Sequence, residues 1–311
     1  MYDEIVVPLD GSTFAEAALP LAAALSKRTK AEVHLVTVME PIPPYAYSEW
    51  EPAVEEQLRS YLDDMAAKLA QRTGGEVSRG VHSGPVVETL LREVELRKAD
   101  LVVMATHGRG ALSRAWLGSV ADRFLRQAST PVLLVRPEER DVEEGTEAQA
   151  EPRVAFETIL VPLDGTDLSE SVLDHAIAFG ELFGSAFHLT RVVTYPLDVA
   201  SPYVPLTVPP ARDLLAEAKA DALGYLEDKA ERMRRRGLRV TTSVAVDTQP
   251  GHGILAEAEA VGCDLVAMAT HGRRGVGRLI LGSAADKVLR GTRVPLLLYR
   301  PGAEGTLPPA A

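Results

Sequence analysis

The sequence contains the same unit twice, and this constrains the fold more than any other feature. The segment Val7–Gly11 recurs letter for letter as Val161–Gly165, and residues 99–137 match residues 263–301 at 22 of 39 positions. The offset is 154 for the first match and 164 for the second, so the second unit carries ten extra residues in its middle. Because an offset of this size is the length of a whole domain, we predict a tandem duplication rather than a solenoid of short repeats.

Composition sets the boundaries of the two units. Residues 138–153 hold seven acidic and two basic side chains and show no hydrophobic period, which is typical of a solvated linker. Residues 302–311 are rich in Gly, Pro and Ala and are predicted to form a flexible tail. The predicted organisation is a first domain over 1–137, an acidic linker over 138–153, a second domain over 154–301 and a tail over 302–311.

Each unit alternates apolar segments of strand length with amphipathic segments such as 13–27 and 54–71. This alternation indicates a parallel sheet covered by helices on both faces, and five strands per unit are typical of a doubly wound α/β domain. In such a domain ligands bind beyond the carboxyl ends of the strands, where the strand order reverses. The predicted strands are 5–9, 32–38, 76–81, 101–105 and 132–135, then 159–163, 186–193, 238–246, 265–269 and 295–299.

Charge and cysteine content exclude several classes of protein. The 33 basic and 44 acidic residues leave a net charge of −11, and aromatic residues make up only 5% of the chain. This argues against nucleic acid as a partner, because such proteins need a basic face and stacking rings. The single cysteine, Cys263, cannot form an internal disulfide. The chain has no apolar run of membrane-spanning length and an acidic N-terminus, so we expect a cytoplasmic protein with no membrane partner.

The segment after the fourth strand of each unit carries the most informative chemistry. Gly108 is followed after nine residues by Gly118 and Ser119, and Gly272 is followed at the same spacing by Gly282 and Ser283. A Gly-Ser pair that opens a helix presents amide groups and a hydroxyl at the positive end of the helix dipole, which suits a phosphate. Arginines in the same loops, namely Arg109, Arg273 and Arg274, add positive charge.

This arrangement resembles the Gly-x2-Gly-x9-Gly-Ser/Thr motif of the universal stress protein family. The likeness covers nearly the whole chain as two tandem domains, with Ala105 and Ala269 in place of the first motif glycine. The resemblance implies a five-stranded parallel sheet of order 3-2-1-4-5 in each domain. The family has one branch that binds ATP and another that does not. The resemblance is to the ATP-binding branch, which implies ATP, with or without Mg²⁺, as the cofactor.

The resemblance further implies which residues hold the nucleotide. The aspartate after the first strand and the end of the second strand would hold adenosine, and the residues of the glycine motif would contact the rest of the nucleotide. The candidate binding residues are Pro8, Asp10, Val38, Met104, Gly108, Arg109, Gly118, Ser119 and Val120 in the first unit, and Pro162, Asp164, Val192, Met268, Gly272, Arg273, Gly282, Ser283 and Ala284 in the second.

Simpler interpretations stand beside these. Asp10 could instead be a purely structural residue that shapes the turn before a helix. Thr13 and Glu16 would then form a capping box at the start of that helix. The seven histidines show no metal-ligand spacing, and His34 and His188, which recur in strands, are expected to be packed or to lie at an interface. We find no catalytic set of nucleophile, base and acid. The leading function is therefore an ATP-binding stress or signalling module, with a slow ATP hydrolase and a nucleotide-free interaction scaffold as the alternatives.

The last predicted strand of each unit bears on assembly. Residues 132–135 and 296–299 are apolar and would lie at a sheet edge, which is an aggregation liability unless it is paired. Universal stress proteins commonly dimerise through this strand. We therefore predict an internal pseudo-dimer in which the two strands pair antiparallel, and the whole chain could form a homodimer through another face.

Overall fold

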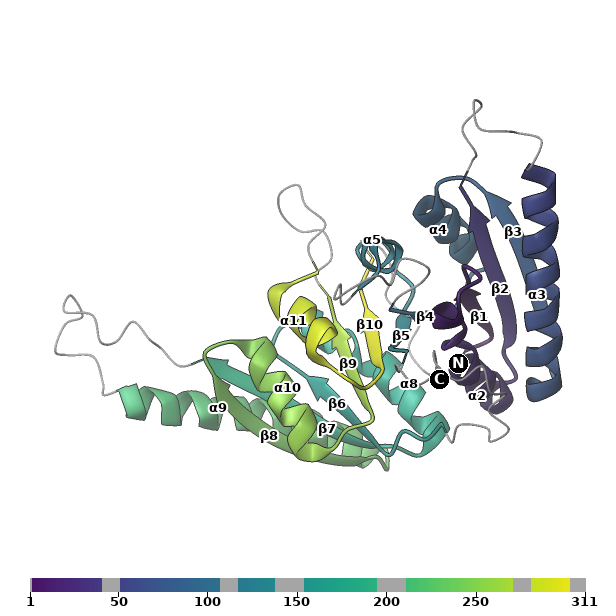
Figure 1. The fold of residues 1–311 in the computed structure, drawn as a ribbon. Coiled ribbons are helices and arrows are strands. Elements are labelled where there is room, and N and C mark those ends of the chain that lie inside the picture. Colours follow the sequence, from purple (N-terminus) through teal and green to yellow (C-terminus); the bar gives the residue numbers. More distant parts are fainter. Residues whose placement is uncertain are drawn as a thin grey trace, which may run out of the picture. The chain divides into compact units, whose positions relative to one another are not determined.

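The computed structural model describes residues 2–40, 51–106, 117–137, 154–194, 211–270 and 281–302 (Figure 1). The first repeat contains, in chain order, β1 (Glu4–Pro8), α1 (Thr13–Glu16), α2 (Leu19–Thr29), β2 (Glu32–Met39), α3 (Glu51–Thr73), β3 (Val77–Ser83), α4 (Val86–Leu96), β4 (Leu101–Ala105), α5 (Ser119–Leu125) and β5 (Val132–Val135). The second contains β6 (Thr158–Pro162), α7 (Asp167–Glu170), α8 (Leu173–Phe183), β7 (Ala186–Thr194), α9 (Ala211–Arg235), β8 (Arg239–Asp247), α10 (Pro250–Val261), β9 (Leu265–Ala269), α11 (Ser283–Gly291) and β10 (Leu296–Tyr299). The ten strands lie within two residues of their predicted positions.

The sheet of the first repeat is parallel and has the predicted order. β1 pairs with β2 on one side and with β4 on the other, while β3 pairs with β2 and β5 pairs with β4. The order is therefore β3-β2-β1-β4-β5. The central strand is buried on both faces, since Ile5, Val6 and Val7 expose none of their surface. Figure 1 shows α3 running along β2 and β3, which it contacts on one face.

A sixth strand extends this sheet. β10, the last strand of the second repeat, pairs antiparallel with β5, so that Leu296 lies opposite Leu134 and Leu298 opposite Val132. All of these side chains are buried. The chain divides into two compact units, and β10 belongs to the first of them. Among the described residues, β10 is the element by which the compact units differ from the sequence repeats, and it covers the apolar edge of β5.

The second unit repeats the parallel arrangement. β6 pairs with β7 and β9, and β8 pairs with β7, so the order is β9-β6-β7-β8. This matches β4-β1-β2-β3 of the first repeat. The ladder between β7 and β8 extends over nine residue pairs, from Ala186 opposite Arg239 to Thr194 opposite Asp247.

The helix after the first strand differs from the prediction. Residues 13–27 were expected to form one helix, but α1 ends at Glu16 and α2 begins at Leu19. Pro20 lies in the first turn of α2, where its missing N–H costs nothing. The same break separates α7 from α8, where Asp174 stands at the matching position. The proline therefore permits the break and does not cause it.

The predicted capping box is also wrong. Ser12 is the N-cap of α1, and its hydroxyl accepts a hydrogen bond from the Ala15 amide at 3.2 Å. Glu16 thus lies one position beyond the place a capping box requires, and its carboxylate instead accepts from the Tyr61 hydroxyl at 3.1 Å. Within the described ranges, no helix combines the length and the apolar character needed to cross a bilayer.

Candidate functional site at the carboxyl edge of each sheet

The strand order brings the predicted site residues of the first repeat to one edge. The chain continues from β1 to β2 on one side, whereas β4 pairs with the other side of β1, so the order reverses between β1 and β4. Pro8 ends β1 and Asp10 follows it. At the end of β4, the Thr106 carbonyl accepts a hydrogen bond from the Gly118 amide at 2.8 Å. Asp10 and the start of α5 therefore both lie at the carboxyl ends of neighbouring strands, where doubly wound domains bind ligands.

The two aspartates are built in the same way. Oδ1 of Asp10 accepts hydrogen bonds from the Ser12 amide at 3.0 Å and the Ser12 hydroxyl at 2.5 Å. Oδ1 of Asp164 accepts from the amide and hydroxyl of Thr166 at 2.9 and 2.6 Å. Ser12 and Thr166 are in turn the N-caps of α1 and α7. Each carboxylate is thus held in a fixed orientation by a turn that also starts a helix.

Asp164 stays ionised in this environment. Partial burial acts to raise the pKa of its carboxyl group, but hydrogen bonds from Thr166 and Ser169 outweigh burial and hold the pKa below its ordinary value. A carboxylate with this environment is a fixed hydrogen-bond acceptor at neutral pH. It is suited to receiving hydroxyl or amino groups of a ligand.

The second repeat adds cations beside this turn, which the sequence analysis did not find. The Arg191 guanidinium lies 5.3 Å from the centre of the Tyr225 ring, and the Lys229 ammonium lies 5.5 Å from the same centre. Glu170 accepts from the Tyr225 hydroxyl at 2.8 Å and from Lys229 at 2.5 Å. A Cβ on Gly165 would lie 3.1 Å from Arg191, so the guanidinium borders the Asp164 turn.

The first repeat lacks these cations. At the repeat offsets of 154 and 164, Thr37 and Met65 stand where Arg191 and Lys229 stand, and both are buried. The pair of Tyr61 with Glu16 remains, matching Tyr225 with Glu170. Aligning the two repeats position by position would have revealed this difference in charge.

The two Gly-Ser pairs begin helices as expected, but their backbones differ. Gly118 is the N-cap of α5 with a φ of −66°, which any residue can adopt. Gly282 is the N-cap of α11 with a φ of 89°, which strongly favours glycine. At neither N-cap does a described side chain make a capping hydrogen bond. Ser119 and Ser283 are exposed at the first helical position.

The remaining candidates line the strands and helices next to this edge. Met104 and Met268 are buried near the ends of β4 and β9, and Pro162 is buried at the end of β6. Val38 and Val192 are half-buried near the ends of β2 and β7, as are Pro8, Val120 and Ala284 in their own elements. Four candidates lie outside the described residues: Gly108, Arg109, Gly272 and Arg273.

Comparison with known families agrees with this arrangement. The family model described as "Universal stress protein family" matches residues 1–136 and matches again at residues 155–300. The chain belongs to the universal stress protein family. The two matches correspond to the two sequence repeats, so this is a tandem member with one family domain in each repeat.

Some relatives of this universal stress protein match it over both repeats, and others match a single repeat. Universal stress protein Rv2005c of Mycobacterium tuberculosis is 27% identical over 303 residues, which cover 95% of this chain and 96% of that protein. A Thermus aquaticus universal stress protein is 34% identical over 140 residues, covering 44% of this chain and 100% of its own length. The crystal structure of a universal stress protein from Archaeoglobus fulgidus superposes with a TM-score of 0.73 at 19% identity, covering 96% of this chain and 98% of that one. That last likeness establishes the fold.

Proposed function

We propose that this universal stress protein binds an adenine nucleotide, ATP in the first instance, at the carboxyl edge of each repeat. Nucleotide occupancy would then determine which partner the protein engages in a stress response. The observation that carries the proposal is the duplicated pairing of a fixed aspartate turn with a Gly-Ser helix start at the point where strand order reverses. Both repeats retain this arrangement, with the same spacing inside the glycine motif, which turn chemistry alone explains poorly.

The chemistry of the edge suggests how the nucleotide would lie. A carboxylate repels phosphate, so Asp10 and Asp164 are better suited to accept hydrogen bonds from ribose hydroxyls. The phosphates would lie toward the starts of α5 and α11, where backbone amides and the hydroxyls of Ser119 and Ser283 can donate. Mg²⁺, where present, would be held chiefly by phosphate oxygens and water.

The same contacts favour binding over hydrolysis. A hydrolase needs a group that orients the attacking water and cations that neutralise the transferred phosphoryl group. The Asp10 and Asp164 carboxylates instead accept hydrogen bonds inside their own turns. We therefore expect ATP turnover far below the median enzyme rate of about 10 s⁻¹.

Calorimetric titration with ATP tests the proposal one repeat at a time. Gly118→Val places a branched side chain where phosphate would approach, and its backbone φ tolerates valine. In the second repeat Asp164→Asn is preferable, because valine at Gly282 would strain a positive φ. Each single variant should abolish or weaken the binding of one equivalent of nucleotide. The double variant should lose binding at both sites. Gly224→Ala is the control, since a Cβ there meets nothing within 4 Å.

Identification of small molecules released by denaturing the purified protein gives an independent measurement. A released adenine nucleotide would support the proposal. No released nucleotide together with no binding heat would favour the nucleotide-free scaffold. Binding with unchanged affinity in the double variant would show that the nucleotide does not occupy these sites. Phosphate release near ordinary enzyme rates that disappears when Asp10 and Asp164 are replaced by alanine would favour the hydrolase.

We also infer that the pairing of β5 with β10 holds the two repeats together as an internal pseudo-dimer. The support is a buried, wholly apolar ladder between strands that come from different repeats. Burying such an edge removes a template for aggregation. A homodimer of the whole chain through another face stays a prediction.

A further inference from the structure

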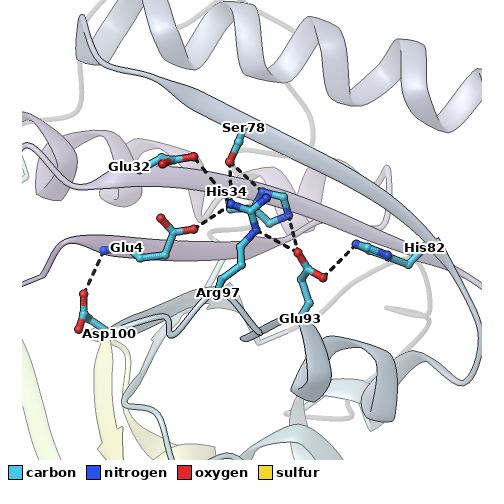
Figure 2. A network of polar contacts seen from close by, with 8 residues as sticks. All are labelled: Glu4, Glu32, His34, Ser78, His82, Glu93, Arg97 and Asp100. Carbon is cyan, nitrogen blue, oxygen red and sulfur yellow. Dashed lines mark hydrogen bonds and ion pairs between the residues drawn. The ribbon is translucent and has the colours of Figure 1, made fainter. Parts of the chain in front are cut away.

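A second polar cluster lies in the first repeat, away from the aspartate turn. Figure 2 shows His34 from β2, His82 from β3 and Glu93 from α4 pointing toward one another. Nε2 of His34 lies 3.3 Å from Oε1 of Glu93, and Nε2 of His82 lies 3.3 Å from Oε2. One atom from each residue can be chosen so that all three lie within 4.8 Å of one another. Two imidazoles and a carboxylate therefore converge on one point.

The two imidazole nitrogens are unsatisfied among the described residues. Nε2 of His34 and Nε2 of His82 are buried atoms that make no hydrogen bond there, although each is close to a Glu93 oxygen. His34 as a whole is only 1% exposed. Because a buried polar atom without a partner is costly, each such atom in a native fold requires an explanation. A bound ligand between these nitrogens is one.

Other contacts orient the His34 ring toward the cluster. Its Nδ1 lies 2.9 Å from the Ser78 hydroxyl oxygen, which also accepts from Arg97. A ring that donates from Nδ1 presents its Nε2 lone pair to the cluster, which is how metal-binding histidines are commonly held.

The second repeat contains the same pair with different neighbours. His188 matches His34, and Glu257 matches Glu93 at the repeat offsets. Nε2 of His188 lies 2.9 Å from the Ser243 hydroxyl and 3.0 Å from Glu257, and the Ser243 hydroxyl donates to Glu257 at 2.6 Å. This histidine is therefore satisfied by hydrogen bonds. These contacts agree with the first of the two roles expected for His188, that of a packed residue.

Strand register identifies the two substitutions that separate the repeats. β2 places Val36 opposite Gly80 and Val38 opposite His82, and β7 places Thr190 opposite Ser243 and Val192 opposite Ala245. The first repeat thus has glycine and histidine where the second has serine and alanine. A Cβ on Gly80 would lie 2.8 Å from Nε2 of His82 and 3.2 Å from Nε2 of His34. The glycine keeps open the space between the two nitrogens.

The charges around the cluster favour a cation. Arg97 donates to Glu93 at 3.0 Å and to Glu4 at 3.1 Å, and lies 3.7 Å from Glu32. Asp100, which accepts from the Glu4 amide, adds a fourth carboxylate to the network in Figure 2. Three carboxylates thus surround one guanidinium, and the carboxylate of Asp100 lies at the edge of the network. The surplus of negative charge compensates for the positive charge that a metal ion would bring.

We propose that His34, His82 and Glu93 form a binding site for a divalent transition-metal ion, with Zn²⁺ as the first choice. Two imidazoles and a carboxylate are a ligand set that Zn²⁺ takes, and other imidazole-binding divalent ions can share it. Zinc bonds of about 2.1 Å at tetrahedral angles separate ligand atoms by about 3.4 Å, close to the distances found here. The side chain of His82 is 36% exposed although its Nε2 atom is buried.

The metal would tie β3 to β2 and α4. The proposed site is tested first on protein from which metal has been removed with a chelator. Binding of Zn²⁺ is followed by calorimetry, and binding of Co²⁺ by visible absorption. We expect one high-affinity equivalent, a Co²⁺ spectrum with nitrogen ligation and a higher melting temperature with Zn²⁺. His82→Ala and Gly80→Ser should each weaken the affinity by about tenfold or more. Gly80→Ser imports the arrangement of the second repeat, so the fold should tolerate it.

A matched control and a gain-of-site variant complete the test. His252→Ala removes an exposed histidine on α10 and should leave Zn²⁺ binding unchanged. The double variant Ser243→Gly with Ala245→His, once shown to be folded, should acquire a second equivalent. No uptake at millimolar Zn²⁺, or binding that His82→Ala and Gly80→Ser leave unaltered, would overturn the proposal. A folded double variant that stays at one equivalent would overturn the argument from strand register.

Discussion

Gly180, in the last turn of α8, should not tolerate even one added methyl group. A Cβ there would overlap Cζ of Phe187 and lie 2.9 Å from its Cε1 and 3.0 Å from Cδ1 of Ile159. Phe187 is 1% exposed and Ile159 is fully buried, so neither can move toward solvent. The rings of Phe179 and Phe183 on this helix and of Phe156, just before β6, pack against one another, with centroids 4.9 to 5.1 Å apart. The neighbourhood therefore has little freedom to repack.

Two opposing contributions to the free energy of unfolding decide whether Gly180→Ala stabilises or destabilises the protein. Alanine is favoured over glycine in a helix by about 1 kcal/mol, whereas overpacking a filled core costs about 1–3 kcal/mol. The overlap with a fully buried ring places Gly180→Ala at the upper end, so we expect a net loss of about 2 kcal/mol. Gly224→Ala, on α9, has nothing within 4 Å of its Cβ and should gain about 0.5–1 kcal/mol.

The first repeat suggests a second substitution that should restore stability to Gly180→Ala. At the offset of 154, Ser26 and Val33 occupy the positions of Gly180 and Phe187. In the first repeat a larger helix residue is therefore accompanied by a smaller strand residue. Phe187→Val alone should cost about 2–4 kcal/mol through lost burial. In that background Gly180→Ala should cost nothing or stabilise, which corresponds to a coupling energy of about 2 kcal/mol.

Urea unfolding of the full chain, followed by far-ultraviolet circular dichroism, measures all four variants. The midpoints should order as Gly224→Ala above the unmodified protein and Gly180→Ala below it. The reasoning is refuted if Gly180→Ala is as stable as the unmodified protein. It is equally refuted if Gly180→Ala costs the same with valine at position 187 as with phenylalanine.

Three further predictions concern other parts of the chain. Leu134→Pro removes a backbone amide from β5, which lies between β4 and β10. It should lower both the melting temperature and the solubility measured by centrifugation. An unchanged solubility would contradict the role given to this edge. Burial raises the pKa of the Cys263 thiol to about 11, so a thiol reagent at pH 8 should react only after denaturation, and fast labelling of the native protein would contradict its burial. Burial lowers the pKa of His175, so its contribution to stability is complete above the ordinary value of about 6.5 and is lost as the pH falls. His175→Gln should accordingly flatten the acid side of the stability profile, and an unchanged profile would count against this explanation.

Local patterns predicted much of this protein. The duplication is visible as repeated letters, and the strands are visible as apolar runs such as 101–105 and 265–269. These features need only neighbouring residues, because a strand buried on both faces must be apolar throughout. The family follows from the same local motifs. The positions of Asp10 and Gly118 at one edge could also be predicted, since parallel strands share the direction of their carboxyl ends.

The errors of prediction have both local and long-range causes. The capping box failed locally, because Ser12 is the N-cap and Glu16 lies one position too far. The hydrogen bond from Tyr61, 45 positions away, to the Glu16 carboxylate is a long-range contact that local patterns do not contain. Aligning the repeats shows that Arg191 replaces an uncharged residue of the first repeat. It does not show that Arg191 lies beside the second aspartate turn, because that position depends on strand register. By contrast, the antiparallel pairing of 132–135 with 296–299 was predicted from their apolar character at a sheet edge, and β5 and β10 do pair in this way. Only the grouping of β10 with the first compact unit had to come from contacts across the chain.

The histidine cluster marks this division most clearly. His34, His82 and Glu93 are 48 and 11 positions apart, and no metal-ligand spacing connects them. Their convergence needs the parallel pairing of β2 with β3, the packing of α4 over those strands and a glycine at position 80. Sequence determines which residue types are present and which segments are strands or helices. Only the tertiary structure decides which side chains meet, because a contact between distant residues depends on register and packing that local patterns do not contain.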